Sequence, residues 1–225
     1  DCRERCRYDN FKFMRILTII LLILLNCQSF SKANNLNEFQ IESMSVGESL
    51  LNFFKKSEIK LLIKSTNSFV YKDNKYVSIT THADYDIYSA SSEDDPYADT
   101  VENYDYVGVV IKPSDNKFII FEINAYLNFP DDYEGCKNKK KEIVSDISSM
   151  FKNIKIESET SPHHYDKSGE SISFDTWFYL DDGYASVHCE KWSKKFQEKY
   201  GWDNKLKVRL TSEKFMNFLA NVQYK

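Results

Sequence analysis

The chain has 225 residues, of which 28% are charged and 42% are apolar, and these proportions are typical of a globular protein and exclude a disordered one. Its six glycines and four prolines are too few for a fibrous or loop-dominated protein. The formal net charge of −4 lacks the basic footprint of a nucleic-acid-binding protein, so we expect no nucleic-acid partner.

An apolar run near the N-terminus indicates export. Residues 16–25 (ILTIILLILL) follow two basic residues and precede Ser31-Lys32-Ala33, which puts small residues at the −3 and −1 positions of a cut after Ala33. These three parts predict a secretory signal peptide over residues 14–33. The run is shorter than the roughly 20 apolar residues that span a bilayer. Residues 1–13 lack an initiating Met and are expected to be non-native upstream translation.

We therefore expect residues 34–225 to form the mature protein, which would be periplasmic or secreted and would carry no transmembrane helix. A lipoprotein anchored through Cys27 is an alternative, although Asn26 is a poor fit to the small residue that such a site requires. Two cysteines, Cys136 and Cys189, follow the export signal. An even pair in an oxidising compartment predicts a disulfide, with two buried free thiols as the alternative.

The first half of the mature chain predicts helices and then a strand. Ser45 with Glu48 three residues later forms a capping-box pattern, and apolar residues at helical spacing continue to Ile63. We expect this helical pair to pack on a sheet. Residues 75–81 (KYVSITT) are rich in β-formers and predict a strand.

An acidic segment follows at residues 84–105, which contain no Lys or Arg. A run of this kind is usually a solvated loop. Clustered carboxylates also suit calcium, and the EF-hand spacing fails because no glycine stands at the turn position. The candidate ligands of a weak calcium site are Asp84, Asp86, Asp94 and Asp95, and we expect no other cofactor.

Residues 104–129 predict a hairpin at the centre of an antiparallel sheet. Two apolar runs flank the turn-forming tetrapeptide PSDN at residues 113–116. In the second run, apolar residues alternate with Glu122, Asn124 and Asn128, which is the period of a strand with one buried face.

The second half of the chain predicts a further hairpin between helices. In order, we expect a helix over residues 138–151, an edge strand over 154–159, a hairpin over 171–180 and 184–190, a helix over 192–200, a strand over 205–210 and a last helix ending near residue 219. The fold class is therefore a single α+β domain over residues 34–225. Its antiparallel sheet has about five to seven strands built on two hairpins, with helices packed on one face in a two-layer arrangement.

The second hairpin has aromatic residues on its nominally outer face. Alternation places Trp177 and Tyr179 on that face, beside Tyr184 and His188 on the returning strand. A helix or loop could cover these side chains. Alternatively, they form a recognition face for a partner or a glycan.

Catalytic residues are not assigned by any motif. The chain lacks a nucleophile elbow, a phosphate-binding glycine loop, a zincin motif and a dinucleotide fingerprint. His163 and His164 lie in a loop without further ligands at metal-binding spacing. His82 lies near two carboxylates of the acidic segment, and His188 follows Ser186 by two residues, so either histidine could belong to a hydrolytic site.

Four segments carry a resemblance: FQIESMSVGESLL, CKNKKKEIVSDISSMF, DKSGES and VHCEKW. On these the chain resembles a group of small, uncharacterised exported proteins of marine Pelagibacter-type alphaproteobacteria, over most of the mature chain. The first segment departs from the group's Gly-Asp-Ser by having Gly47-Glu48-Ser49. The resemblance implies export and two retained cysteines, and it supplies no reaction and no site residue.

Three functions remain open from the sequence. The first is an exported, non-enzymatic protein that binds a partner, an envelope component or a small ligand. The second is an exported hydrolase or metal-dependent enzyme that uses a histidine with the acidic segment. The third is a structural envelope protein.

Overall fold

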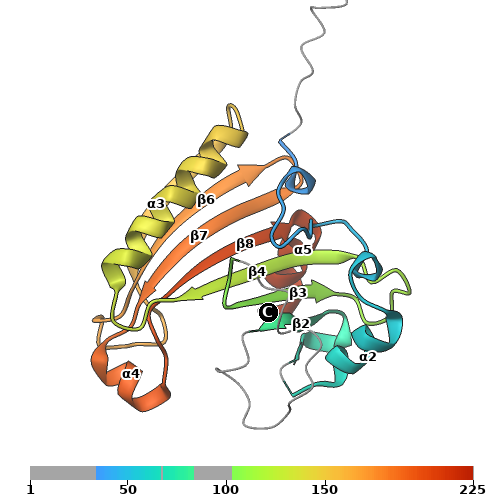
Figure 1. Cartoon of the computed structure of the whole chain (residues 1–225), viewed down its shortest axis with the longest axis horizontal. Helices are drawn as coiled ribbons and strands as arrows, with labels where there is room; N and C mark the ends of the chain where they lie inside the picture. Colours follow the sequence, from blue (N-terminus) through green and yellow to red (C-terminus); the bar gives the residue numbers. More distant parts are fainter. Residues whose placement is uncertain (1–33, 67, 84–102, 225) are drawn as a thin grey trace, which may run out of the picture. The chain divides into compact units, whose positions relative to one another are not determined.

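A computed structural model describes residues 34–66, 68–83 and 103–224, which form one eight-stranded antiparallel sheet with flanking helices (Figure 1). The strands are β1 (Phe69–Val70), β2 (Val77–Ala83), β3 (Tyr106–Ile111), β4 (Ile120–Asn128), β5 (Lys155–Pro162), β6 (Ile172–Leu180), β7 (Gly183–Lys191) and β8 (Lys205–Ser212). The α+β class is confirmed. The predicted count of five to seven strands is wrong, because β1 adds a two-residue strand that is too short to show a period of two.

The strand order is β1-β2-β3-β4-β8-β7-β6-β5, so the two predicted hairpins lie in different halves of the sheet. The hairpin β3–β4 and the hairpin β6–β7 are not paired with each other in the ladder. Instead, β8 pairs with β4 on one side and with β7 on the other. This places β4, from the first hairpin, in the middle of the sheet, and the first six residues of β4 are buried.

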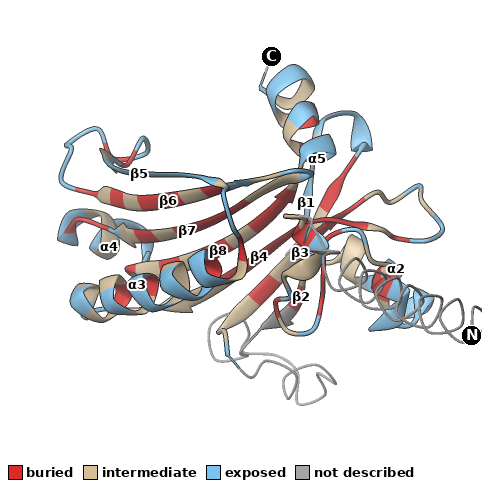
Figure 2. Ribbon diagram, turned by 90° about the horizontal axis from the view of Figure 1, so that it is seen from above, coloured by how far each residue is buried: buried red, intermediate tan, exposed pale blue. Residues whose placement is uncertain are grey.

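The main core lies on one face of the sheet. Alternate residues of β3, β4, β7 and β8 point to this face, and Val109, Ile123, Val187 and Val208 are fully buried there. Helix α2 (Lys56–Lys64) contributes Ile59, and helix α3 (Tyr133–Met150) covers the opposite half of the same face. Figure 2 shows α3 exposed on its outer side, and buried residues alternating with intermediate ones along β6, β7 and β8.

The short helix α5 (Glu213–Phe218) differs from α2 and α3 because it packs on the opposite face of the sheet. Its Phe215 and Phe218 form a separate small core with Tyr76, Val110 and Phe121. Val110 neighbours Val109 in the chain, and successive strand residues point to opposite faces, so the two cores lie on opposite sides of the sheet. The predicted placement of the helices on one face therefore describes α2 and α3 but not α5.

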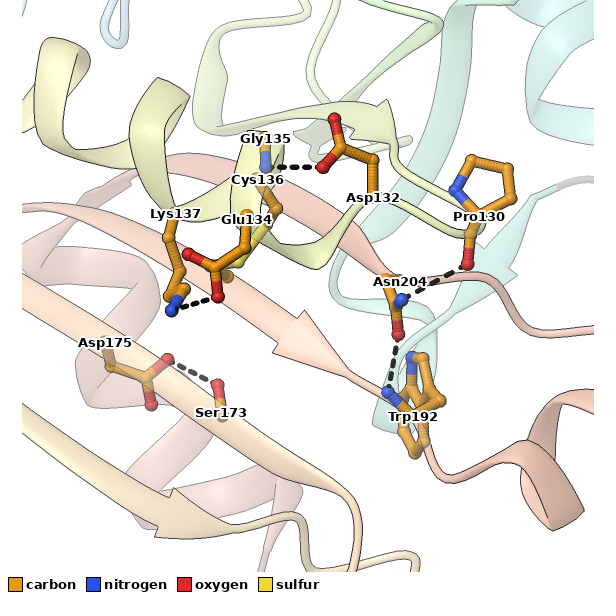
Figure 3. The surroundings of a disulfide bond; sticks show 11 residues. Pro130, Asp132, Glu134, Gly135, Cys136, Lys137, Ser173, Asp175, Trp192 and Asn204 are labelled. Carbon is orange, nitrogen blue, oxygen red and sulfur yellow. Dashed lines mark hydrogen bonds and ion pairs between the residues drawn. A yellow bond between two sulfur atoms is a disulfide. The ribbon is translucent and has the colours of Figure 1, made fainter.

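The predicted disulfide joins Cys136 to Cys189, with 6.0 Å between their Cα atoms (Figure 3). Asp132 caps α3 by accepting a hydrogen bond from the backbone N–H of Gly135 at 2.8 Å, which fixes Cys136 in the first turn. Cys189 lies in β7, and both cysteines are fully buried. The bridge therefore ties the first turn of α3 to the sheet.

Ser45 and Glu48 do not begin the helix that their spacing predicts. The carboxylate of Glu48 does accept from the backbone N–H of Ser45 at 3.1 Å, but the chain continues as a turn. A short 3-10 helix (Leu50–Asn52) follows, capped by Ser49. The local hydrogen bond thus forms without helix propagation.

Several predictions fall outside the described part of the chain. These are the signal peptide at residues 14–33, the upstream residues 1–13, the Cys27 lipid anchor and the calcium candidates Asp84, Asp86, Asp94 and Asp95. Of the residues that the structure describes, none belongs to a helix with the length and apolar character needed to span a bilayer.

Candidate functional site

The sheet face opposite α3 carries polar and aromatic side chains that converge from four strands. The register sets the pairs Asp175 with His188, Trp177 with Ser186, and Ser186 with Arg209 across neighbouring strands. We call this surface the polar face, and its central residues are Glu122, Asn124, Tyr126, Asp175, Trp177, Tyr179, Tyr184, Ser186, His188, Lys207, Arg209 and Thr211.

A hydrogen-bonded chain of Ser186, His188 and Asp175 occupies one half of the polar face. His188 Nε2 lies 2.8 Å from Ser186 Oγ, and His188 Nδ1 lies 2.8 Å from Asp175 Oδ1. Ser173 Oγ also donates to Asp175 Oδ1. With the carboxylate accepting from Nδ1–H, Nε2 is left to accept the hydroxyl proton of Ser186. The order of groups is that of a nucleophile, a base and an orienting carboxylate.

Burial keeps this histidine neutral near pH 7. Removal from water lowers the pKa of His188 below its ordinary value, and the Asp175 carboxylate only partly offsets that effect. A neutral imidazole is the form that can accept a proton from Ser186.

The other half of the polar face is a network on β4 and β8. Buried Glu122 accepts from Thr211 Oγ1 at 2.7 Å and from Asn124 Nδ2 at 2.7 Å. Arg209 Nε donates to Asn124 Oδ1 at 3.0 Å and lies 3.9 Å from a Glu122 carboxylate oxygen. Asn124 and Glu122 thus hold the Arg209 guanidinium in one position, and Thr211 in turn holds Glu122.

Lys207 lies between these two networks. Its cross-strand neighbours are His188 on β7 and Tyr126 on β4, and its Nζ lies 5.2 Å from the centre of the Tyr126 ring. Lys205, two residues earlier on the same face, pairs with Glu190 at 3.8 Å. No described carboxylate lies within ion-pairing distance of Lys207. Burial, followed by the charge of Arg209, lowers the pKa of Lys207 to about 7.

The four residues of the predicted aromatic face lie on this surface together. Trp177 contacts the edge of His188 with 5.8 Å between ring centres, and Tyr179 pairs across the strands with Tyr184. Tyr179 is exposed and donates its hydroxyl to Glu157 at 2.8 Å. Trp177 is half-buried on the sheet face opposite α3.

The remaining candidate residues do not join this surface. His82 belongs to β2, in the other half of the sheet, and the carboxylates near it in sequence lie outside the described residues. His163 and His164 stack on each other at 5.0 Å in the loop before β6. Among the described residues, no three His, Cys, Asp or Glu side chains are grouped as a metal site would require.

The geometry limits what chemistry the polar face can perform. The Ser186 side chain is fully buried, so a substrate carbonyl has no direct approach to Oγ. Strand β7 is paired along both edges, and its backbone N–H groups are therefore used in the sheet ladder and not free to stabilise an oxyanion. The arrangement is better suited to holding a group in place than to attacking one.

Comparisons with protein-family models, with curated proteins and with solved structures found no match to this chain. The function of the polar face must therefore be inferred from its geometry.

Three charged residues of the polar face that matter to its electrostatics were not site candidates from the sequence. Asp175, Lys207 and Arg209 lie on predicted strands, and alternation assigns each to its outer face. Their association depends on β8 lying between β4 and β7, which no local pattern indicates. The spacing of Ser186 and His188, in contrast, pointed to a contact that the structure contains.

Proposed function

We propose that this chain is an exported, non-enzymatic binding protein whose polar face holds a small ligand with an anionic group. The observation that carries the proposal is Lys207, a partly buried cation without a carboxylate partner, flanked by the fixed guanidinium of Arg209. A buried charge is ordinarily paired, because desolvation disfavours it. An anionic ligand would supply the missing partner.

The surroundings of Lys207 support binding because they are already ordered. Arg209 is held by Asn124 and Glu122, and His188 is held by Asp175 and Ser186. Side chains fixed in advance lose little conformational entropy when a ligand arrives. Trp177 and Tyr126 give the same surface apolar walls that could contact the body of the ligand.

Export is part of the proposal. The signal-peptide pattern of residues 14–33 and the resemblance to exported alphaproteobacterial proteins both favour it. The disulfide between Cys136 and Cys189 is compatible with an oxidising compartment.

The test compares anion-dependent thermal stability in two variants of the same strand. Phosphate, succinate and citrate are titrated at about pH 6 and about pH 8.5, with melting followed by fluorescence. We expect a bound anion to raise Tm more at the lower pH, where Lys207 is protonated, because a ligand that binds only the folded state stabilises it. Lys207→Met should abolish the effect, whereas Lys205→Met, which removes a paired lysine, should retain it.

Native mass spectrometry of the secreted protein gives an independent result. A mass excess that disappears on denaturation and is absent from Lys207→Met would identify the natural ligand. If wild type and Lys207→Met show the same anion response and the same native mass excess, the proposal is wrong. If Trp177→Ala and Tyr179→Ala leave binding intact, the aromatic side chains have no part in it.

A hydrolase is the second candidate, and the chain from Ser186 through His188 to Asp175 is the observation that favours it. Its test is labelling with a fluorophosphonate, which reacts with activated serines. Labelling of wild type that is lost in both Ser186→Ala and His188→Ala would establish a catalytic serine and contradict the non-enzymatic proposal. We expect no labelling, because Ser186 Oγ is buried.

A further inference from the structure

A pocket of about 440 Å³ opens where β7 is followed by α4 (Lys194–Tyr200). This volume is in the range of small-molecule binding sites. The pocket shares no lining residue with the polar face. We call it the α4 pocket, and the lining residues that matter below are Tyr133, Lys191, Trp192, Lys194, Lys195 and Asn204.

The walls of the α4 pocket are fixed by buried hydrogen bonds. Asn204 accepts from the backbone N–H of Trp192 at 2.9 Å and donates to the carbonyl of Pro130 at 3.2 Å (Figure 3). On the other side, Ser193 donates its hydroxyl to Asp166 at 2.9 Å and its backbone N–H to Ser171 at 2.9 Å. The pocket is therefore formed before any ligand binds.

Trp192 lines this pocket and carries an unused hydrogen-bond donor. The residue is only 4% exposed, and its indole Nε1 is buried without an acceptor in the described part of the chain. A buried indole N–H ordinarily has a partner, so an unsatisfied one on a residue that lines a pocket is a donor that a ligand oxygen could satisfy.

The charges around the pocket favour an anion. Lys191, Lys194 and Lys195 all line it, and none has a carboxylate within ion-pairing distance among the residues described. Asp131 and Glu170 also line the pocket, so lysines exceed carboxylates by three to two.

Aromatic rings extend from the pocket to the surface. Trp192 contacts Trp202 edge-on with 4.8 Å between ring centres, and Trp202 contacts Tyr165 at 6.0 Å. Trp202 is 36% exposed and Tyr165 is 61% exposed. A sugar ring has apolar C–H faces that pack on aromatic rings and hydroxyl edges that need polar partners, and both kinds of partner are present here.

We propose that the α4 pocket binds an acidic saccharide. Its carboxylates would pair with Lys191, Lys194 and Lys195, an oxygen atom would accept from Trp192 Nε1, and the chain of sugars would extend over Trp202. The proposal is independent of the polar face, because a different set of residues carries it.

The test is isothermal titration calorimetry of the full mature chain with trigalacturonate, with neutral maltotriose and inorganic phosphate as comparison probes. Saturable binding of trigalacturonate is expected, with no binding of maltotriose and at least tenfold weaker binding of phosphate. Lys194→Gln combined with Lys195→Gln should weaken binding at least tenfold, whereas Lys199→Gln on the same helix, outside the pocket lining, should not change it.

Trp192→Phe tests the indole donor, because it keeps an aromatic ring and removes the N–H. We expect about three- to tenfold weaker binding at an unchanged Tm. The exposed lysine pair tests the site even if Trp192→Phe fails to fold. The proposal is wrong if maltotriose binds as tightly as trigalacturonate, or if the lysine double variant binds unchanged. It is also wrong if Lys207→Met loses trigalacturonate binding, because the site would then lie on the polar face. If phosphate binds as tightly as trigalacturonate, the pocket is a simple anion site and the saccharide proposal is wrong.

Discussion

Lys140, on α3, donates from Nζ to Thr176 Oγ1 on β6 over 2.6 Å, and it does so beneath the helix with only 2% of its surface exposed. The ammonium also lies 3.7 Å from the centre of the Phe174 ring. Burial lowers the pKa of Lys140 to about 8. Lys140 therefore lies on the buried side of α3, where the apolar stripe of the helix would lead one to expect a core residue.

Removing the acceptor of Lys140 should destabilise the fold. We expect Thr176→Val to lower the free energy of unfolding by about 1–3 kcal/mol, because a buried ammonium loses its hydrogen bond. Lys140→Met combined with Thr176→Val should recover most of that loss. Urea unfolding of the two single variants and the double variant measures the coupling, and strictly additive effects would contradict it.

The stability of the protein should depend on pH through Lys207. The pKa of this lysine is about 7 in the folded state and about 10.5 in the unfolded chain, so between these values the unfolded state binds more protons. The free energy of unfolding therefore rises with pH across this window. Lys207→Met should flatten the rise and increase stability by about 1–2 kcal/mol near pH 6, where the buried charge is fully present.

Lys205→Met is the matched control for this pH dependence, since Lys205 is paired with Glu190 on the same strand. Chemical unfolding at intervals from about pH 6 to about pH 9 gives both profiles. A slope that is the same in wild type and Lys207→Met would show that Lys207 titrates normally.

The disulfide should contribute substantially to stability. It links residues 53 positions apart, and in the chain-entropy model a loop of this size stabilises the folded state by about 4 kcal/mol. We expect the Cys136→Ala, Cys189→Ala double variant to lose about that amount in guanidinium unfolding. Wild-type protein that is reduced in the denatured state and refolded in reductant should show the same loss. Equal stability of the oxidised and reduced proteins would contradict the prediction.

Asp175 should control the titration of His188. Its carboxylate raises the pKa of His188 and so partly opposes the lowering by burial. Asp175→Asn should therefore lower the pKa of His188 further and increase the fraction of the other tautomer. NMR of the imidazole nitrogens measures both, and Ser173→Ala, which removes only a hydrogen bond to Asp175, should have the smaller effect.

Much of the fold could be predicted because its signals are local. Alternation in residues 119–129 and 171–190 gave the strands, Asp132 and Ser212 cap the helices that follow them, and Gly201 ends α4 in the left-handed conformation as its position predicts. The helix predicted at Ser45 was wrong because tertiary contacts of that segment with the β3–β4 turn outweighed a local capping pattern.

The candidate site could be predicted only in part, because its residues come from strands far apart in the sequence. The alternation of strand residues placed Trp177 and His188 on one face, because their relation depends only on the pairing of β6 with β7 in a local hairpin. The neighbours of Lys207 are set by β4 and β7 on either side of β8, and parity within one strand does not determine which strands pair.

The position of β8 has a consequence for how the chain folds. The half-sheet β1–β4 and the half-sheet β5–β7 are joined in the ladder only through β8, which comes last of the eight strands in the chain. Its pairing with β4 brings together residues such as Glu122 and Thr211, and contacts this distant in sequence form slowly. The two hairpins can form early, but the backbone groups of β4 and β7 that pair with β8 are then still unpaired. The complete sheet forms only when β8 is added between them. Of peptides copied from single strands, one with the sequence of β8 should therefore inhibit folding most effectively, because it would compete with β8 for pairing to β4 and β7.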